Sequence, residues 1–361
     1  MNKEKLSYIY NKINFILEFV LSIMLVIMMF KTIYIKNNYG YYPKMNVILC
    51  GILAIFLGSI MIINIIKHKN KIEKMFLNFM IPIGIAYLVF IMPTYVPDEQ
   101  AHVYRAYDIG ARGNIFSKLE EGEYKTLIPE QMEKSMKGFV NNYNELVAKK
   151  NEVANYEDLS RVYNVPRGYF PILYIFSAVV FLIGKLITIN PIIIMYLARI
   201  PNYIMFLILG YYSIKKIPFG KLLVLTYLFT PMSIQQAVSV SADSLSNSVI
   251  IFFIAYTLFL AYKSDKIKTS QKCIYYLLAF IVGIAKIAYF PISTLSLLLL
   301  QNKKESKKNI WIMIIITVVI ATISSIGWYL YSMKYPSETP YIQENNINSL
   351  EQIKYIVRKS N

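Results

Sequence analysis

The sequence predicts an all-α, polytopic integral membrane protein, and three observations support this fold class. Of the 361 residues 56% are hydrophobic, and the mean hydropathy is positive at +0.44. Several apolar runs have 18 or more residues, which is enough for a helix to cross the hydrocarbon core of a bilayer. The net charge is +17, but the lysines lie mostly between the apolar runs, as expected where cytoplasmic loops are rich in Lys and Arg. We therefore attribute the charge to membrane topology and expect no nucleic-acid partner.

Residues 1–92 are expected to hold the N-terminal transmembrane spans. The apolar runs place these spans at about 13–33, 46–66 and 75–92. The first run is full length, follows several lysines and lacks a small-residue cleavage site, which is typical of a start-transfer anchor. The basic cluster at 67–74 is expected in the cytoplasm together with the N-terminus. We thus expect a multi-pass protein of the cell membrane, surrounded by membrane lipids.

Residues 93–167 are expected to form an external loop, because the third span ends on the outer side. This loop holds 12 of the 21 acidic residues and ten basic ones, whereas the rest of the chain is strongly basic. A connection of such length is usually functional or disordered when it has no secondary structure of its own. Surface helices are expected within 130–150.

Residues 168–332 are expected to form a transmembrane bundle, and residues 333–361 an external tail. Spans are expected at about 192–212, 222–236, 249–261 and 310–331. The apolar run 274–300 has basic residues at both ends, so both ends should lie on the same side of the membrane. This pattern predicts a tight helical hairpin with Lys286 and Pro291 near its turn.

The apolar run 170–187 leaves two alternatives open. If it crosses the membrane, Lys215, Lys216 and Lys221 fall outside, against the usual distribution of basic residues. If it is re-entrant or juxtamembrane, these lysines fall inside. We favour the second alternative, in which protein or a hydrated cavity covers the partly inserted backbone.

The most informative stretch follows the third span and combines acidic, basic and imidazole side chains. Pro97 suits the first position of a helix, and Asp98 and Glu99 would lie in its first turn near the positive end of the helix dipole. With 3.6 residues per turn, Asp98, His102 and Arg105 share one face, and Glu99 lies beside it. The sequence therefore predicts a polar stripe at the membrane surface.

These side chains suit a transfer reaction. Asp98 could act as general base toward an acceptor hydroxyl, Arg105 could hold a phosphate in bidentate fashion, and Tyr104 could stack on a sugar. In a simpler alternative Asp98 and Glu99 only cap a helix, and Arg105 anchors it at the interface. A divalent cation held by Asp98, Glu99 and His102 is a further alternative, but hard cations prefer more ligands, all of them oxygen. We expect no metal and no other cofactor.

Three more ionisable residues lie within or beside the later apolar runs. Asp243 follows a serine in a short polar segment and is a second site candidate, whose simpler role is helix capping. Lys286 interrupts an apolar run, where a charge is costly unless it reaches the interface or finds a partner. The phosphate of a lipid carrier would be such a partner. Arg199 allows the same interpretation.

The stretch Pro97-Asp98-Glu99-x-x-His102-x-x-Arg105-Ala106-Tyr107 resembles the signature of a large bacterial family of predicted membrane proteins. That family is a domain of unknown function (DUF) grouped with the GT-C glycosyltransferases. Later segments of the chain resemble further landmarks of the family in the same order: Tyr169-Phe170-Pro171, Thr230-Pro231-Met232, Ser241-Ala242-Asp243, Ala285-Lys286, Tyr289-Phe290-Pro291 and Glu351-Gln352-Ile353. The resemblance extends over nearly the whole chain from about Ile83.

The resemblance implies a GT-C-like helical bundle with a large first external loop. It implies a membrane glycosyltransferase that takes a sugar from a polyprenyl-phosphate donor and gives it to a cell-envelope acceptor on the outer face. The acidic position of such enzymes carries over to Asp98 as catalytic base, with Glu99 beside it. We further expect the substrates to contact these residues: His102, Tyr104, Arg105, Asp243 and Lys286.

The chain departs from the family pattern in two ways. An extra hairpin of two spans precedes the acidic motif, which preserves its sidedness. The chain also ends at Asn361, where the resemblance predicts further spans, so a truncated protein is expected. A non-enzymatic transporter, flippase or assembly partner for lipid-linked glycans is the alternative function. Transport predicts charged residues at several depths of the membrane, whereas transfer predicts them gathered at the outer face.

Overall fold

The computed structural model describes residues 3–67, 72–116, 125–137, 155–163, 165–333 and 349–359. Within these ranges five helices are long and apolar enough to cross a membrane. They lie in α1 (Lys3–Tyr39), α3 (Ile72–Phe90), α8 (Pro191–Lys216), α11 (Ala242–Tyr262) and α13 (Lys307–Ser332). The expected all-α, polytopic membrane fold is therefore confirmed.

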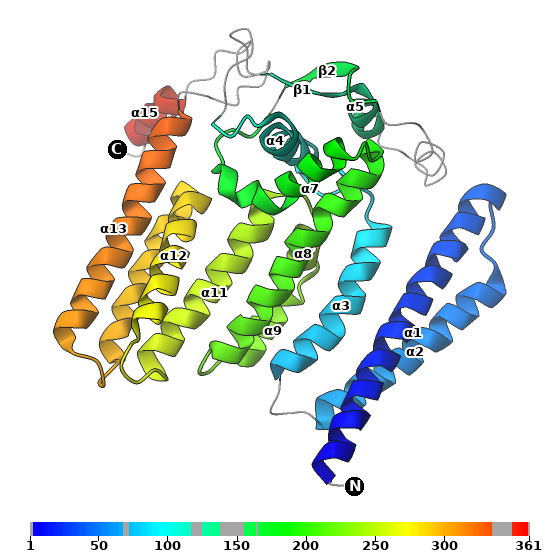
Figure 1. Cartoon of the computed structure of the whole chain (residues 1–361), viewed down its shortest axis with the longest axis horizontal. Coiled ribbons are helices and arrows are strands. Elements are labelled where there is room, and N and C mark those ends of the chain that lie inside the picture. The colour runs from blue at the N-terminus through cyan, green and yellow to red at the C-terminus, as the bar shows by residue number, and fades with distance from the viewer. Residues whose placement is uncertain are drawn as a thin grey trace.

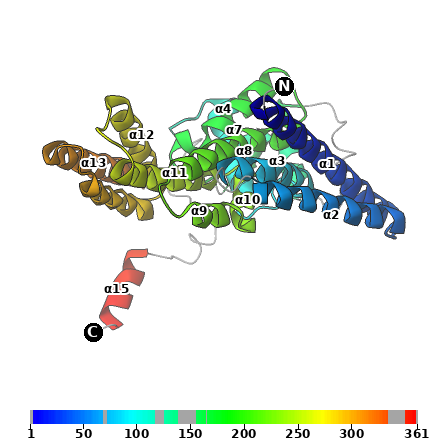
Figure 2. The ribbon, with the colours of Figure 1, turned by 90° about the horizontal axis from the view of Figure 1, so that it is seen from below.

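The N-terminal helices form a hairpin beside the main bundle (Figure 1). Helix α1 packs against α2 (Lys44–Lys67), and α3 packs against both α1 and α8. Much of the apolar surface of α1 and α2 is exposed, with Ile55 72% accessible, as expected for helices that face lipid. Figure 2 shows this hairpin at one edge of the bundle and α13 at the other. Residues 68–71 of the predicted basic cluster at 67–74 lie outside the described residues.

Two short helices lie across one end of the bundle instead of running along it (Figure 1). They are α4 (Glu99–Arg112) and α7 (Ile175–Leu186), which follows a 3-10 turn, η1 (Pro171–Tyr174). Twelve residues of α-helix extend only about 18 Å, so α7 is too short to span a bilayer. A Cβ atom on Gly110 of α4 would lie 1.9 Å from the Ala178 carbonyl oxygen of α7, so this contact requires glycine. The short length of α7 and its crosswise direction favour the juxtamembrane alternative over a full span.

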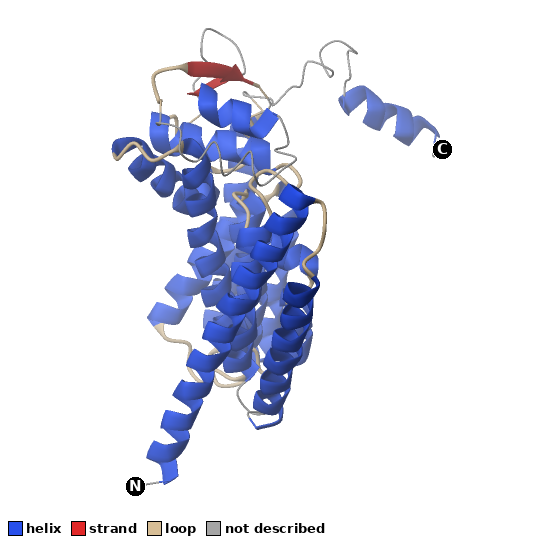
Figure 3. Cartoon of the chain, turned by 90° about the vertical axis from the view of Figure 1, so that its right-hand side faces the viewer, coloured by secondary structure: helices blue, strands red, loops and turns tan. Residues whose placement is uncertain are grey.

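A small strand hairpin covers the same end, called the α4 end below (Figure 3). Strand β1 (Thr126–Pro129) pairs antiparallel with β2 (Leu159–Val162), and α5 (Glu130–Lys137) follows β1. Helix α5 is one of the surface helices expected within 130–150, and the rest of that range lies outside the described residues.

The predicted span 222–236 is not one continuous helix. It consists of α9 (Lys221–Leu228) and α10 (Pro231–Ala237). Thr230 has an extended backbone, with φ −63° and ψ 138°, because the proline that follows disfavours the helical conformation and lacks an N–H. The Thr230 hydroxyl instead accepts a hydrogen bond from the Ser233 N–H, which starts the second helix.

The predicted hairpin at 274–300 is present, and its turn lies at the α4 end. Its arms are α12 (Thr269–Ala285) and η2 (Ile287–Gln301), which pack against each other and against α13. The second arm is a 3-10 helix, whose rise of about 2.0 Å per residue lets 15 residues extend about 30 Å. Lys286 joins the two arms in an extended conformation. The tail includes a further helix, α15 (Ser349–Lys359).

Candidate functional site

Asp98 lies exposed at the α4 end, immediately before the first turn of α4. Its backbone is left-handed, with φ 61° and ψ 0°, a conformation that is uncommon for residues other than glycine. Its side chain makes no capping hydrogen bond to the helix. The structure therefore differs from the capping alternative, and Pro97 lies before the helix instead of at its first position. Strain of this kind persists where the surroundings hold it and is common at functional sites.

Glu99 has a different environment, although it is the next residue. Its side chain is fully buried and forms a two-point ion pair with Arg199 of α8, at 2.8 Å to Oε1 and 2.5 Å to Oε2. The Val240 N–H donates to Oε1 at 2.8 Å, and the Thr94 N–H donates to Oε2 at 2.7 Å. Four donors thus occupy both carboxylate oxygens, and this contact fixes the start of α4 against three other segments.

Arg199 completes the same network from the other side. Its Nη1 atom donates to the Ile91 carbonyl at 2.5 Å, and Nη2 donates to the Met92 carbonyl at 2.9 Å. These carbonyls lie just after the end of α3, where the last turn of a helix leaves acceptors without partners. Burying an unpaired charge is costly, and the buried Arg199 guanidinium is paired with Glu99 and two carbonyls.

Asp243 of α11 and Lys286, at the turn between α12 and η2, meet at the α4 end. The Lys286 Nζ atom lies 2.9 Å from Oδ1 of Asp243 and 3.1 Å from Oδ2, and both side chains are partly exposed. The ammonium also lies 5.5 Å from the ring centre of Tyr169 and 5.8 Å from that of Tyr289, within the range of cation–π attraction. Ser241, and not Asp243, is the capping residue of α11, since its hydroxyl accepts from the Asp243 N–H at 3.1 Å.

His102 lies one turn after Asp98 and connects it to this pair. The His102 Nδ1 atom is 2.7 Å from the Tyr174 hydroxyl, and the imidazole packs edge-on against Tyr169 at 5.2 Å. Burial lowers the pKa of His102, while the Asp243 and Asp98 carboxylates act in the opposite direction. The direction of this shift favours the neutral form of the ring.

The same two carboxylates also act on Tyr169, which therefore belongs to this neighbourhood. Burial raises the pKa of Tyr169, the Asp243 carboxylate raises it further, Lys286 lowers it, and Asp98 raises it. Five residues from four segments thus lie within electrostatic reach of one another, since Asp98 and His102 share the start of α4. We call this set the polar cluster: Asp98, His102, Tyr169, Asp243 and Lys286.

Arg105 does not face the polar cluster. Its side chain is fully buried, and its guanidinium donates to the Asn114 carbonyl at 3.1 Å and the Ile115 carbonyl at 2.8 Å. Asp108, also fully buried, lies 3.5 Å away. Helix α4 is short, and the turn after Gly113 brings these carbonyls back toward Arg105. Arg105, which was predicted to bind phosphate, therefore holds the turn after α4 against the helix.

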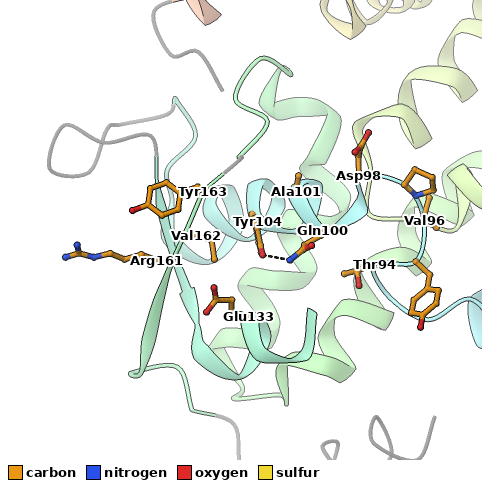
Figure 4. A pocket seen from close by; sticks show the side chains of 12 residues that line it. Thr94, Val96, Asp98, Gln100, Ala101, Tyr104, Glu133, Arg161, Val162 and Tyr163 are labelled. Atoms are coloured by element: carbon orange, nitrogen blue, oxygen red, sulfur yellow. Dashed lines mark hydrogen bonds between the residues drawn. The ribbon is translucent and has the colours of Figure 1, made fainter. Parts of the chain in front are cut away.

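A cavity of about 540 Å³ opens beside Asp98, between α4, α5 and the strand hairpin (Figure 4). Tyr104 faces this cavity, and its hydroxyl accepts a hydrogen bond from the Gln100 amide at 2.6 Å. Glu133 of α5 and Arg161 of β2 contribute charged groups to the lining. Asp98 lines the cavity and also acts on His102, so it lies between the cavity and the polar cluster.

The sequence interpretation omitted several of these residues from the candidate site. Tyr169 belongs to a segment that resembles the family, Tyr169-Phe170-Pro171, but the sequence analysis assigned it no function. Gln100, Glu133 and Arg161 carry no pattern of their own, since only folding brings α5 and β2 over α4.

Comparison with known proteins agrees with the membrane fold. A family model described as a predicted membrane protein (DUF2142) matches residues 79–360 of this chain. No curated protein matches the chain, and no solved structure matches it. The family match covers well over half of the chain, including α4, the polar cluster and the cavity. The chain therefore belongs to the DUF2142 family of predicted membrane proteins.

Proposed function

We propose that this protein is a GT-C-like glycosyltransferase that moves a sugar from a polyprenyl-phosphate donor to a cell-envelope acceptor on the outer face. The observation that supports this most is the position of Asp98. Its carboxylate lies at the edge of a cavity, on a strained backbone, and belongs to the polar cluster that includes Lys286. A carboxylate so placed can accept a proton from a hydroxyl within hydrogen-bond distance.

In the proposed reaction the acceptor hydroxyl attacks the anomeric carbon of the donor sugar. A new C–O bond forms, the hydroxyl proton goes to the Asp98 carboxylate, and the bond from the anomeric carbon to the phosphate oxygen breaks. The leaving polyprenyl phosphate keeps that electron pair and gains negative charge. A cation already fixed beside the phosphate stabilises this charge as it develops.

Lys286 is the cation that suits this role. It lies at the turn between α12 and η2, where the head group of a membrane lipid would be found, and its ammonium is partly exposed. Asp243 and the rings of Tyr169 and Tyr289 hold the ammonium in place without enclosing it. A phosphate can therefore approach Lys286 while the lysine keeps its protein contacts.

Glu99 takes a positioning role in this proposal, in place of the catalytic one expected from the sequence. Both of its oxygens already accept hydrogen bonds from Arg199 and two backbone N–H groups. This network fixes the peptide that follows Asp98. Arg105 likewise supports α4 and is not assigned to the donor phosphate.

The distribution of basic residues supports an outer-face site. Lys215 and Lys216 lie at the end of α8 opposite the polar cluster, and Lys221 at that end pairs with Glu73 at the start of α3. Basic residues are enriched on the cytoplasmic side of membrane proteins, so this end is assigned to the cytoplasm together with the N-terminus. The polar cluster then faces outward, as transfer from a polyprenyl-phosphate donor on that face requires.

The test is turnover by the full chain in lipid nanodiscs, supplied with radiolabelled polyprenyl-phosphate sugars and envelope glycans. Asp98→Asn removes the base and should lower transfer by about 10²- to 10⁴-fold, the usual contribution of general-base catalysis. Asp158→Asn is the matched control, because Asp158 is exposed and does not line the cavity. Transfer that survives Asp98→Asn in a folded protein would remove Asp98 from the mechanism. Movement of the donor across the bilayer with no glycan product would favour the transporter instead.

A further inference from the structure

We propose that the cavity beside Asp98 is the acceptor site and binds the hydroxyl-rich end of a glycan, with Glu133 and Tyr163 as its main contacts. This inference rests on the proposed function and assigns the chemical class of the acceptor substrate. The cavity volume of about 540 Å³ lies within the range of ligand sites, roughly 300–1,000 Å³. The residues that carry the argument come from three elements and the loop before α4.

The floor of the cavity is rich in hydrogen-bonding groups. Gln100 and Tyr104 lie one turn apart on α4 and are already joined by a hydrogen bond of 2.6 Å. Glu133 is only 7% exposed, and Figure 4 shows its carboxylate turned toward the same space as Tyr104. Burial raises the pKa of Tyr104, and the Glu133 carboxylate raises it as well, so these two groups are close in space. Amide, phenol and carboxylate together offer both donors and acceptors to a polyhydroxylated ligand.

The mouth of the cavity carries exposed aromatic rings. Tyr163 is 49% exposed and Tyr95 is 42% exposed, and both line the cavity. Such rings present a flat apolar face together with a polar hydroxyl. A sugar ring is apolar on its C–H faces and polar at its edges, so it can stack on these tyrosines while its hydroxyls reach the floor.

The residues that line the cavity do not suit the other substrate, the polyprenyl-phosphate sugar donor. A polyprenyl chain in this cavity would displace water from the polar groups of Gln100, Tyr104 and Glu133 and place apolar surface against them, which carries a desolvation penalty. A phosphate would meet two carboxylates, Glu133 and Asp98, against one guanidinium, Arg161, so the charged groups of the lining are negative on balance. The donor phosphate is better placed beside Lys286, which does not line this cavity.

Asp98 connects the cavity with the polar cluster. Among the described residues it is the member of the polar cluster that also lines the cavity. An acceptor in the cavity would therefore have a hydroxyl beside the Asp98 carboxylate, and a donor held by Lys286 would approach from the polar cluster. This arrangement brings nucleophile, base and leaving group together.

The experiment measures glycan binding separately from donor binding, on the full chain in nanodiscs. The glycan probe is the mixture of soluble oligosaccharides released from the envelope of the producing cell, followed by saturation-transfer NMR. We expect Glu133→Gln and Tyr163→Ala each to weaken binding about five- to tenfold, the loss of roughly one good contact. The matched controls are Glu130→Gln on the same helix and Tyr41→Ala, since neither residue lines the cavity.

Donor binding is measured on the same samples with undecaprenyl phosphate as the probe. We expect Lys286→Ala to weaken it, and Glu133→Gln and Tyr163→Ala to leave it unchanged. The inference is overturned if the wild-type chain binds no oligosaccharide, or if the two cavity variants bind it as tightly as the controls. If glycan binding depends on Glu133 but undecaprenyl phosphate does not bind, the proposed transferase fails and the cavity is a glycan site without that reaction.

Discussion

The carboxylates of Asp98 and Glu99 are neighbours in the chain but lie in opposite environments. Glu99 is fully buried and accepts four hydrogen bonds, two of them from Arg199. Asp98 is exposed at the edge of a cavity, has a left-handed backbone and makes no capping bond. The Glu99 carboxylate therefore has a structural role, and the Asp98 carboxylate is accessible to a substrate.

The basic side chains divide in the same way. Arg105 and Asp108 are both fully buried, and the guanidinium of Arg105 is further engaged by two carbonyls. Lys286 and Asp243 pair at 2.9 Å but remain 33% and 22% exposed. Charge and position near the membrane therefore do not by themselves identify a catalytic group. Access and unused hydrogen-bonding capacity separate the candidates.

Loss of the buried Glu99–Arg199 ion pair should have the strongest effect on stability. Arg199→Met should lower the free energy of unfolding by about 3–5 kcal/mol, because it leaves the Glu99 carboxylate buried without its partner. Lys286→Met removes a partly exposed charge and should change stability by no more than about 1 kcal/mol. Unfolding by SDS in mixed micelles measures both.

The double variant Glu99→Gln with Arg199→Met serves as the control for the buried pair. It removes the orphaned charge, so it should regain part of the stability that Arg199→Met loses. Equal losses for Arg199→Met and Lys286→Met would contradict the division into a buried structural pair and an accessible one.

Much of the fold was predictable because hydropathy accumulates over many consecutive residues. The long helices coincide with the predicted spans, and the basic ends of 274–300 predicted its hairpin. The exception, 222–236, shows the limit of such averaging, since the break at Thr230-Pro231 is a local steric effect inside an apolar run. Hydropathy alone does not register that effect.

The candidate site was predictable only in part. The sequence drew attention to Asp98, His102, Asp243 and Lys286, which the structure brings together. Helical spacing placed Arg105 on the same face as Asp98, but it does not reveal that the turn after α4 covers that face. The Glu99 partner is 100 residues away in the chain, and such distant pairings depend on how the helices pack.

A smaller effect is expected from the strained backbone of Asp98. Asp98→Gly should raise the free energy of unfolding by about 0.5–1 kcal/mol, because glycine adopts positive φ without steric penalty. The same change should remove activity under the proposed mechanism. Gln100→Gly is the matched control and should instead lower stability by about 1 kcal/mol, since it places glycine inside α4. Loss of stability in both variants would show that Asp98 is itself a structural contact.

The smallest effect at neutral pH is expected at His102, and it should grow as the solution is made acidic. Burial lowers the pKa of His102 below its ordinary value of 6.5, so in acid the unfolded chain binds this proton more readily than the folded one. Stability should therefore fall as the pH drops through about 6.5 toward the lowered pKa of the folded state, and change no further from this group below it. His102→Asn keeps an amide near the Nδ1 position for Tyr174 and should flatten this pH dependence.

The comparison of interest is the slope of unfolding free energy against pH between 7 and 5 in micelles, wild type against His102→Asn. The chain has only two histidines, so few groups other than carboxylates contribute in this window. An unchanged slope in His102→Asn would mean that the imidazole titrates as freely as in the unfolded chain. The His102 side chain would then resemble the accessible groups, such as Asp98, more than the buried Glu99 and Arg199.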